Sequence, residues 1–249
     1  MAFITVSTAS AHLGKSIQYN AFVPDGGQTD VPVFLLMHGL SDDYTQWQRF
    51  TETERYAAER GVAVIMPDGD RSFYTDMKYG QAYYSCMVED IMGSARNLFP
   101  ISRRRERTFT AGLSMGGYGA AKIALRNPDM FAGCIALSGC VDIAKLAREN
   151  AFDDFKLIWG EDYSTTVPGS DDDTIALLKK VKESGKPMPR LYVAVGDDDF
   201  LLDHNHNFRD AAAELGYDIK YEQGPGNHNW PFWNEYLPKG MDFILAGME

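Results

Sequence analysis

Residues 108–120 read Thr-Phe-Thr-Ala-Gly-Leu-Ser-Met-Gly-Gly-Tyr-Gly-Ala and place Ser114 at the centre of a Gly-x-Ser-x-Gly pattern. An apolar, β-prone segment, residues 108–111, precedes the pattern, and a helix-prone segment, residues 118–125, follows it. A strand that turns abruptly into a helix holds such a serine at a strained corner, with its Oγ exposed above the sheet. A Cβ on either flanking glycine would clash in so tight a turn. We therefore predict a nucleophile elbow at Ser114; the alternative is a glycine-rich turn without chemistry.

The balance of charges limits the partners that the chain can bind. The 249 residues are 45% hydrophobic and 24% charged, with a formal net charge of −11. That length suits one large α/β domain or two small ones, and it is ample for a buried core. Nucleic acids and anionic membranes both need a basic face, so we expect neither as a partner. The one basic run, residues 103–107, is interpreted as a solvated connection between a helix and a strand.

Cysteine usage and the N-terminus favour a cytoplasmic location. Cys86, Cys134 and Cys140 are odd in number and form no Cys-x-x-Cys pair, which indicates neither a disulfide framework nor a zinc knuckle. Cys134 and Cys140 are interpreted as small buried hydrophobes. The first residues, Met-Ala-Phe-Ile-Thr-Val-Ser, contain no basic region and no long apolar region, so we predict no signal peptide. No apolar run approaches the ~18 residues of a membrane span.

Strands alternate with helices along most of the chain. The segments 33–37 and 62–66 are continuous apolar runs, as expected for strands buried on both faces. Thr51 is predicted to begin a helix as its N-cap, and Gly61 to end that helix. The alternation predicts an α/β fold with a mostly parallel sheet covered on both faces. The predicted strands are 3–8, 16–23, 33–37, 62–66, 108–112, 134–138, 190–195 and 218–222, and the predicted helices are 51–60, 82–98, 116–126, 203–215 and a last one from Trp230.

The segment 141–189 breaks this alternation. It contains helical pieces and a turn, and it has no clear strand. Because it follows one predicted strand and precedes the next, we expect a cap-like insertion above the carboxyl edge of the sheet, where ligands bind in open α/β sheets. Its run of aspartates, residues 171–173, is interpreted as a loop that leads to a helix N-cap rather than as a metal site. We predict one domain, residues 1–249, with this insertion.

A serine nucleophile needs a base within hydrogen-bond reach and an acid that orients the base. In folds with this type of elbow the partners follow in the order serine, acid, histidine. His12 and His38 precede Ser114, and two further histidines, 204 and 206, lie at the start of a predicted helix close behind the candidate acids. His228 lies in a loop after the last predicted strand, which makes it the predicted base. A surface histidine without a role is the alternative.

The candidate acid lies in the loop that follows strand 190–195. This loop contains Asp197, Asp198 and Asp199, so three carboxylates compete. Asp199 is favoured because the apolar pair Phe200-Leu201 follows it and would anchor it inward. The other two are interpreted as solvated or helix-capping groups, and the residues alone leave all three open.

The oxyanion formed during attack on a carbonyl needs backbone N–H donors. One donor is expected at Met115, directly after the nucleophile. The other is expected at Leu40, in the loop His38-Gly39-Leu40 that follows strand 33–37. The role of His38 is interpreted as holding this loop by hydrogen bonds. Four aromatic residues are candidates for lining the pocket, each with a core position as the alternative: Trp47, Tyr74, Trp230 and Trp233.

The chain resembles bacterial serine esterases of the esterase D and tributyrin esterase group, which also contains S-formylglutathione hydrolases, feruloyl esterases and acetylxylan esterases. The resemblance spans about residues 3–245 and is most specific around Ser114. It implies the α/β-hydrolase fold, the triad Ser114, Asp199 and His228, and an oxyanion hole formed by the Leu40 and Met115 amides. The matching segments are residues 38–40, 73–76, 79–80, 111–119, 196–201 and 226–230.

These observations predict a serine carboxylesterase that hydrolyses short-acyl esters through an acyl-enzyme, without a metal or organic cofactor. A short acyl group is expected because the insertion has no long apolar stretch of the kind found in a lipase lid. The alternatives are a carbohydrate-ester esterase, an S-formylglutathione hydrolase, transfer of the acyl group to an acceptor other than water, and a binding protein on an inactive scaffold. The expected partner is a small ester, and a homodimer or homotetramer is an open expectation.

Overall fold

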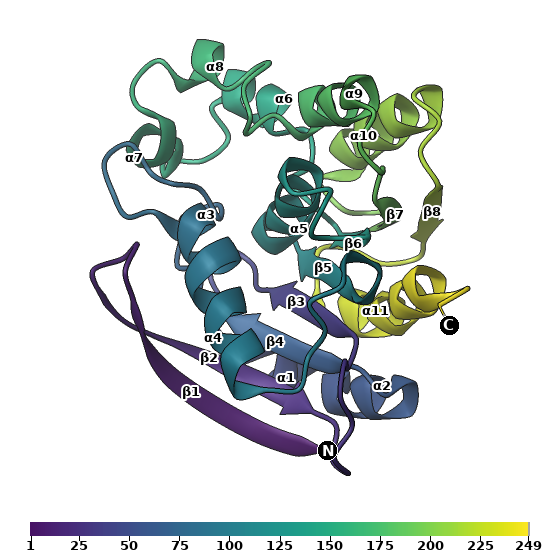
Figure 1. Ribbon diagram of the computed structural model, residues 1–249. Helices are drawn as coiled ribbons and strands as arrows, with labels where there is room; N and C mark the ends of the chain where they lie inside the picture. Colours follow the sequence, from purple (N-terminus) through teal and green to yellow (C-terminus); the bar gives the residue numbers. More distant parts are fainter. Residues whose placement is uncertain (249) are drawn as a thin grey trace.

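The computed structural model describes residues 1–248, which form one eight-stranded sheet in the order β1-β2-β4-β3-β5-β6-β7-β8 (Figure 1). The first two strands form an antiparallel hairpin, and β2 also runs antiparallel to β4. All other neighbours are parallel, which confirms the predicted mostly parallel sheet. The strands are β1 Ala2–Ser10, β2 Lys15–Val23, β3 Val33–Met37, β4 Ala63–Pro67, β5 Thr108–Leu113, β6 Gly133–Leu137, β7 Arg190–Gly196 and β8 Ile219–Gly224.

Burial follows the position of each strand in the sheet. The central strands β3, β4, β5 and β6 are buried at every residue, as their apolar runs require. The edge strand β1 instead exposes every second side chain, Phe3 among them. Because neighbouring strands from β3 to β8 run parallel, their carboxyl ends lie at one edge of the sheet, and the loops that leave this edge lie close together.

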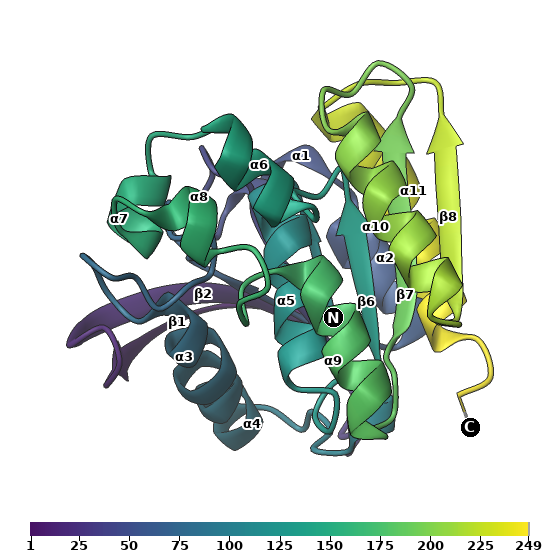
Figure 2. The same cartoon turned by 90° about the horizontal axis from the view of Figure 1, so that it is seen from above.

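Helices cover both faces of the sheet (Figures 1 and 2). The helices α4, α5, α9 and α10 contribute to the larger apolar core on one face, and α2 and α11 to the smaller core on the other. The helical elements are α1 Gln46–Phe50, α2 Thr53–Arg60, α3 Tyr83–Ser85, the π-helix η1 Cys86–Ile91, α4 Met92–Leu98, the 3-10 helix η2 Arg105–Arg107, α5 Met115–Arg126, α6 Ile143–Glu149, α7 Phe155–Trp159, α8 Tyr163–Thr166, α9 Thr174–Ser184, α10 Leu202–Glu214 and α11 Trp230–Leu245.

The helix predicted at 51–60 begins later than expected, and Thr51 is not its N-cap. Thr51 ends α1 instead, where its hydroxyl donates a hydrogen bond to the Trp47 carbonyl. Gly61 does end α2, in the left-handed conformation with φ of +61°. The helix predicted at 82–98 is present as α3, η1 and α4 in succession.

The insertion 141–189 contains α6, α7, α8 and α9 and, within the described residues, no strand, as predicted. Asp173 is the N-cap of α9, because its carboxylate accepts the Ile175 and Ala176 amides. The carbonyl of Asp172 accepts the Tyr118 hydroxyl from α5 at 2.9 Å. The insertion is thus held against the helix that follows Ser114.

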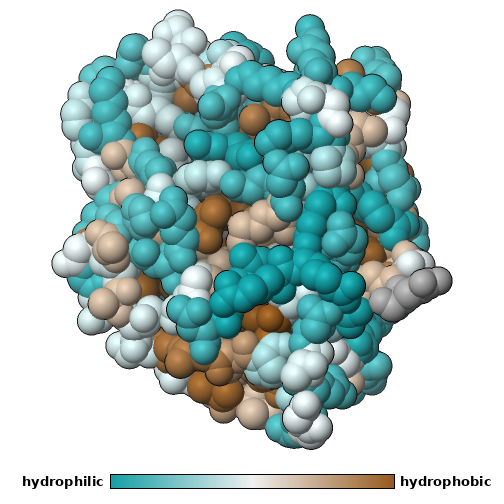
Figure 3. Space-filling model, viewed as in Figure 1, coloured by the Kyte–Doolittle hydropathy of each residue, from teal (hydrophilic) through white to brown (hydrophobic). Residues whose placement is uncertain are grey.

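The face seen in Figure 3 is mostly hydrophilic, with apolar patches of limited size. Across residues 1–248, none of the helices combines the length and the apolar character that a bilayer span requires.

Candidate active site

Ser114 lies at the corner between β5 and α5, in a strained backbone conformation. Its φ is +53° and its ψ is −117°, a region that costs a residue with a side chain about 1–3 kcal/mol. Its own amide donates to the Leu137 carbonyl at 2.9 Å. A Cβ on Gly112 would lie 2.3 Å from the Gly116 carbonyl oxygen, and a Cβ on Gly116 would lie 2.4 Å from the Met37 carbonyl oxygen. The clashing atoms belong to the backbone and cannot move away as a flexible side chain could. Both positions therefore require glycine.

The side chains of Ser114, His228 and Asp199 meet at the carboxyl edge of the sheet. The Ser114 Oγ lies 2.9 Å from His228 Nε2, and His228 Nδ1 lies 3.0 Å from Asp199 Oδ2 and 3.1 Å from Oδ1. The carboxylate can only accept, so Nδ1 carries the proton, and the bare Nε2 accepts from the serine hydroxyl. The three residues follow β5, β7 and β8, so the topology alone brings these distant parts of the chain together.

Asp199 is the acid that reaches the imidazole among the three candidates. It is only 5% exposed, whereas Asp197 and Asp198 are exposed. Its Oδ1 also accepts the Leu201 amide at 2.9 Å. The expected apolar anchor is half correct: Leu201 is buried, but Phe200 is 66% exposed and lies against the imidazole instead of in the core.

The loop after β3 is held in one conformation by hydrogen bonds. The Gly39 carbonyl accepts from His38 Nδ1 at 2.7 Å and from the Asp42 amide at 3.2 Å, and the Gly39 amide donates to Asp42 Oδ2 at 3.0 Å. The carbonyl of Gly39 and the N–H of Leu40 belong to one trans peptide, so they point in opposite directions. The bonds to Gly39 therefore fix the direction of the Leu40 N–H.

His38 holds this loop, as predicted, and its ring is fixed from two sides. The Gly69 amide donates to Nε2 at 2.8 Å, so the proton of the neutral ring is assigned to Nδ1. The Tyr74 hydroxyl donates to the His38 carbonyl at 3.0 Å. Tyr74 is fully buried, and this burial raises the pKa of its hydroxyl well above the ordinary value.

A cavity of about 420 Å³ opens beside Ser114. Its wall is mainly aromatic and aliphatic, and Trp230 and Trp233 belong to it, as predicted for these two. The lining residues are Gly39, Leu40, Ser41, Asp42, Phe73, Leu113, Ser114, Met115, Cys140, Phe152, Phe200, His228, Asn229, Trp230 and Trp233.

Two of the residues predicted to contact substrate lie behind this wall. Trp47 is 1% exposed, packs edge-on against Trp230 at 5.3 Å, and donates its indole N–H to the Met37 carbonyl. Tyr74 is turned toward His38, as described above, and the neighbouring Phe73 faces the cavity. For these two residues the core position, which was the alternative, is the one observed, because a polar group on each ring donates to a buried backbone carbonyl.

Several residues that line the cavity are not among the predicted site residues. Phe73 and Phe152 come from loops far apart in sequence and contact each other with ring centroids 5.3 Å apart. Cys140 is buried, as predicted, but it also lines the cavity, and burial raises the pKa of its thiol to about 12. Asp42 lies two residues beyond Leu40, and its position in the loop that follows strand 33–37 was a signal that could have identified it.

A second hollow in the described part of the chain differs in its side chains from the cavity beside Ser114. A larger hollow of about 680 Å³ lies between β1 and α2, and neither histidine nor cysteine lines it. Among residues 1–248, no three or more histidine, cysteine, aspartate or glutamate side chains are placed to hold a metal ion.

Known proteins are similar to this chain over nearly its whole length. Residues 10–244 match a family model described as "Putative esterase". The acetyl esterase of Caldicellulosiruptor saccharolyticus is 32% identical over 263 residues, which cover 98% of each chain.

Two solved structures from Staphylococcus aureus are similar over nearly all of their length. The fluorophosphonate-binding serine hydrolase FphF superimposes with a TM-score of 0.91 at 31% identity, with 98% of each chain covered. The S-formylglutathione hydrolase FrmB superimposes with a TM-score of 0.89 at 32% identity, covering 98% of this chain and 99% of that one. The fold is therefore the α/β-hydrolase fold, as the resemblance implied.

Proposed function

The chain belongs to the "Putative esterase" family of carboxylic ester hydrolases, and we propose that it is a serine carboxylesterase for short-acyl esters that works through an acyl-enzyme. The observation that carries this proposal is the chain of contacts from Ser114 Oγ to His228 and from His228 to Asp199. A serine alone is a weak nucleophile, and these contacts supply both its base and the group that orients the base.

The reaction follows from the direction of these hydrogen bonds. His228 Nε2 takes the hydroxyl proton as Ser114 Oγ bonds to the ester carbonyl carbon. Asp199 keeps the other ring proton on Nδ1 and stabilises the imidazolium that forms. The C–O bond to the alcohol then breaks, and the alcohol leaves with the proton from Nε2. In the second half a water attacks the acyl-enzyme, gives its proton to Nε2, and the acid is released as Ser114 regains a proton.

We assign the oxyanion hole to the amides of Leu40 and Met115. Leu40 lines the cavity, and the bonds to Gly39 fix the direction of its N–H. Met115 begins α5, where no helical carbonyl precedes its amide. The Ser114 amide is engaged with the Leu137 carbonyl and is not available. Two such donors lower the barrier by several kcal/mol, since removing one costs about 3–4 kcal/mol in other enzymes.

The size and wall of the cavity support a short acyl group. The volume of about 420 Å³ is at the lower end of the range for small-molecule sites. Trp230 and Trp233 form part of the wall for the acyl or the alcohol group. Hydrolysis of short-acyl thioesters is a second candidate, because the S-formylglutathione hydrolase FrmB is as similar in sequence as the acetyl esterase.

Substitution of the nucleophile tests the proposal. We expect Ser114→Ala to abolish hydrolysis of p-nitrophenyl acetate and to abolish covalent labelling by a fluorophosphonate, while the melting temperature stays near that of the wild type. Near-normal turnover by this variant would contradict the proposal. A wild type that is neither labelled nor active on any short ester would instead support a binding protein on an inactive scaffold.

A further inference from the structure

Asp42 is an acidic side chain in the wall of the reaction cavity. Among the described residues that line the cavity, no lysine or arginine accompanies it. Its Oδ2 lies 3.0 Å from the Gly39 amide, one residue before the proposed oxyanion donor Leu40. The carboxylate is therefore fixed close to the place where the ester carbonyl binds.

Five of the loops that supply the wall repeat this charge, whereas the loop that supplies Phe73 contains Arg71 and Lys78. Residues 38–45, 138–142, 150–154, 197–201 and 225–229 surround or supply the wall and contain no lysine or arginine. The same loops contain eight aspartates: Asp42, Asp43, Asp142, Asp153, Asp154, Asp197, Asp198 and Asp199.

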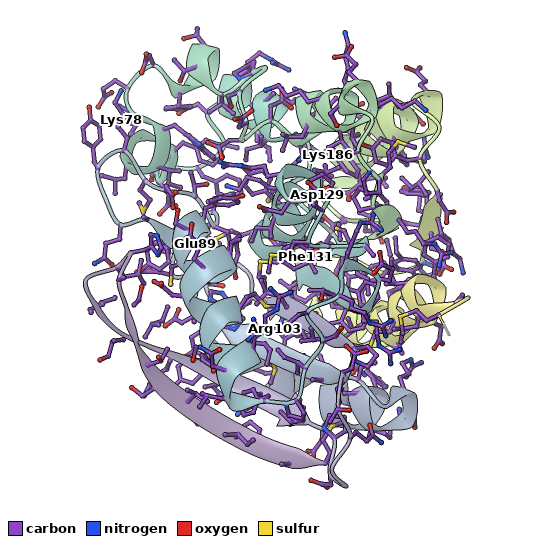
Figure 4. The ribbon with its side chains drawn as sticks, in the orientation of Figure 1. Lys78, Glu89, Arg103, Asp129, Phe131 and Lys186 are labelled. Carbon is purple, nitrogen blue, oxygen red and sulfur yellow. The ribbon has the colours of Figure 1, made fainter. Side chains whose placement is uncertain are left out.

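Two cations close to this edge, Arg71 and Lys78, are paired with carboxylates. Arg71 lies 3.5 Å from the Leu40 carbonyl, but its guanidinium forms a fork with Asp154 at 2.8 and 2.9 Å. Lys78, which Figure 4 shows at the periphery, lies 3.6 Å from Asp162. A fork of this kind matches one cation to one carboxylate, so Arg71 does not offset the charge of Asp42.

The surroundings of Asp42 act on the pKa of its carboxyl in both directions. Burial raises this pKa above the ordinary value and the Asp43 carboxylate raises it further, whereas the hydrogen bond from the Gly39 amide and the His38 and His228 rings lower it. An assay at pH 8 lies well above the ordinary range of an aspartate.

We propose that Asp42 makes this site selective against anionic esters, so that its substrates are uncharged or cationic on both sides of the scissile carbonyl. The inference rests on the proposed esterase function and specifies the substrate class of the same site. A second negative charge about 6–10 Å from Asp42 in a partly solvated cavity lowers kcat/KM by about tenfold. Thioesters of glutathione, which carry carboxylates, would accordingly be poor substrates, and this restricts the second candidate function to thioesters of uncharged thiols.

A set of acetate esters with one shape and different charge tests this inference. The anionic member is 4-acetoxybenzoate, the neutral member is its methyl ester, and the cationic member is the acetate of 4-hydroxyphenyltrimethylammonium. The kcat/KM of each ester at pH 8 is divided by its rate of hydrolysis by hydroxide, which removes the difference in leaving-group reactivity. We expect the wild type to prefer the neutral ester over the anionic one by about tenfold and to accept the cationic one at least as well as the neutral one.

Asp42→Asn is the decisive variant, because the amide oxygen of asparagine can still accept the Gly39 N–H while the charge is gone. We expect it to bring the neutral-to-anionic ratio close to one. Asp43→Asn is the matched control, because it removes one charge at the residue next to Asp42. The Asp43 carboxylate accepts hydrogen bonds from Thr45 and does not line the cavity. In this control the ratio should stay within about threefold of the wild-type value.

Several outcomes overturn the inference and leave the esterase function intact. These are a wild-type ratio near one, a ratio that Asp42→Asn leaves unchanged, or an equal change in Asp43→Asn. A merely structural role of Asp42 would slow all three esters by the same factor. Failure of the esterase function itself is recognised separately, as a wild type that hydrolyses none of the three.

Discussion

Asp199→Asn should nearly abolish activity, because the surroundings of this carboxylate dictate how an amide would sit in its place. The Leu201 amide donates to Oδ1 and therefore selects the carbonyl oxygen of the asparagine. The amide nitrogen is then directed at His228 Nδ1, which lies 3.0 Å from the other oxygen of the native carboxylate. Because that nitrogen is a donor, Nδ1 must accept, and the imidazole proton moves to Nε2.

A proton on Nε2 faces Ser114 Oγ, so the ring can no longer take the hydroxyl proton. Loss of the correct tautomer through the same substitution in a serine protease triad lowers kcat by about 10⁴, which corresponds to about 5.5 kcal/mol of transition-state stabilisation. We expect a loss of that order here, since the serine-to-imidazole distance of 2.9 Å is already that of a formed hydrogen bond. The KM for a short ester should change little, because Asp199 does not line the cavity.

The measurement is kcat and KM for p-nitrophenyl acetate at pH 8, with thermal unfolding as a check that the variant is folded. Asp198→Asn is the matched control, because Asp198 is exposed and lies one residue away. That control should keep its kcat within about twofold. A loss of less than tenfold in Asp199→Asn, or an equal loss in both variants, would refute the tautomer argument.

Two further substitutions test groups that support the site. His38→Leu removes the donor to the Gly39 carbonyl and should lower kcat about 30-fold with KM nearly unchanged. His38→Asn keeps a donor and should lower kcat less. Equal losses of kcat in the two variants, measured in kinetic assays, would contradict this role of His38. Burial lowers the pKa of Lys122 to about 8, so between pH 8 and 10.5 the unfolded chain binds more protons at this residue, and stability rises with pH. In urea unfolding, the stability of the wild type relative to Lys122→Met should therefore increase by about 2 kcal/mol from pH 8 to pH 10, and a constant difference would refute it.

The elbow and its two partner residues could be predicted because few residues of the chain meet the requirements of these positions. Gly112 and Gly116 are required by backbone atoms within 2.4 Å of their missing Cβ positions, and such a requirement leaves a visible pattern in the sequence. The histidine could be found by elimination, since the chain has five and the fold constrains their order. Asp199 remained one of three carboxylates, because the bond that selects it, from the Leu201 amide, depends on the conformation of the loop.

The wall of the cavity was predicted less well, because the sequence does not tell which of two neighbouring aromatic side chains points into the cavity. Phe73 and Tyr74 both adopt a positive φ of 49°, so the loop turns sharply between wall and core. Both side chains are fully buried in the larger core, but Tyr74 is turned toward His38, whose carbonyl its hydroxyl reaches, and of the two only Phe73 also lines the cavity. Lys122 then fixes the turn from below by donating to the Phe73 carbonyl at 3.2 Å. Neither the hydrophobic periodicity nor the propensities of single residues predict these long-range hydrogen bonds.

Asp42 combines two roles that a single substitution can separate. An uncharged acceptor would hold the Gly39 amide equally well, and it would avoid placing a second negative charge near the oxyanion that forms on the substrate. The same charge, however, attracts the imidazolium that forms on His228 in the same step. For a neutral ester these two effects oppose each other, so the loss of the charge should change the rate only slightly. For an anionic ester the substrate adds a repulsion from the Asp42 carboxylate, and no lysine or arginine is among the described residues that line the cavity. The ratio of the two rates therefore reports the charge of Asp42 far more sensitively than either rate alone.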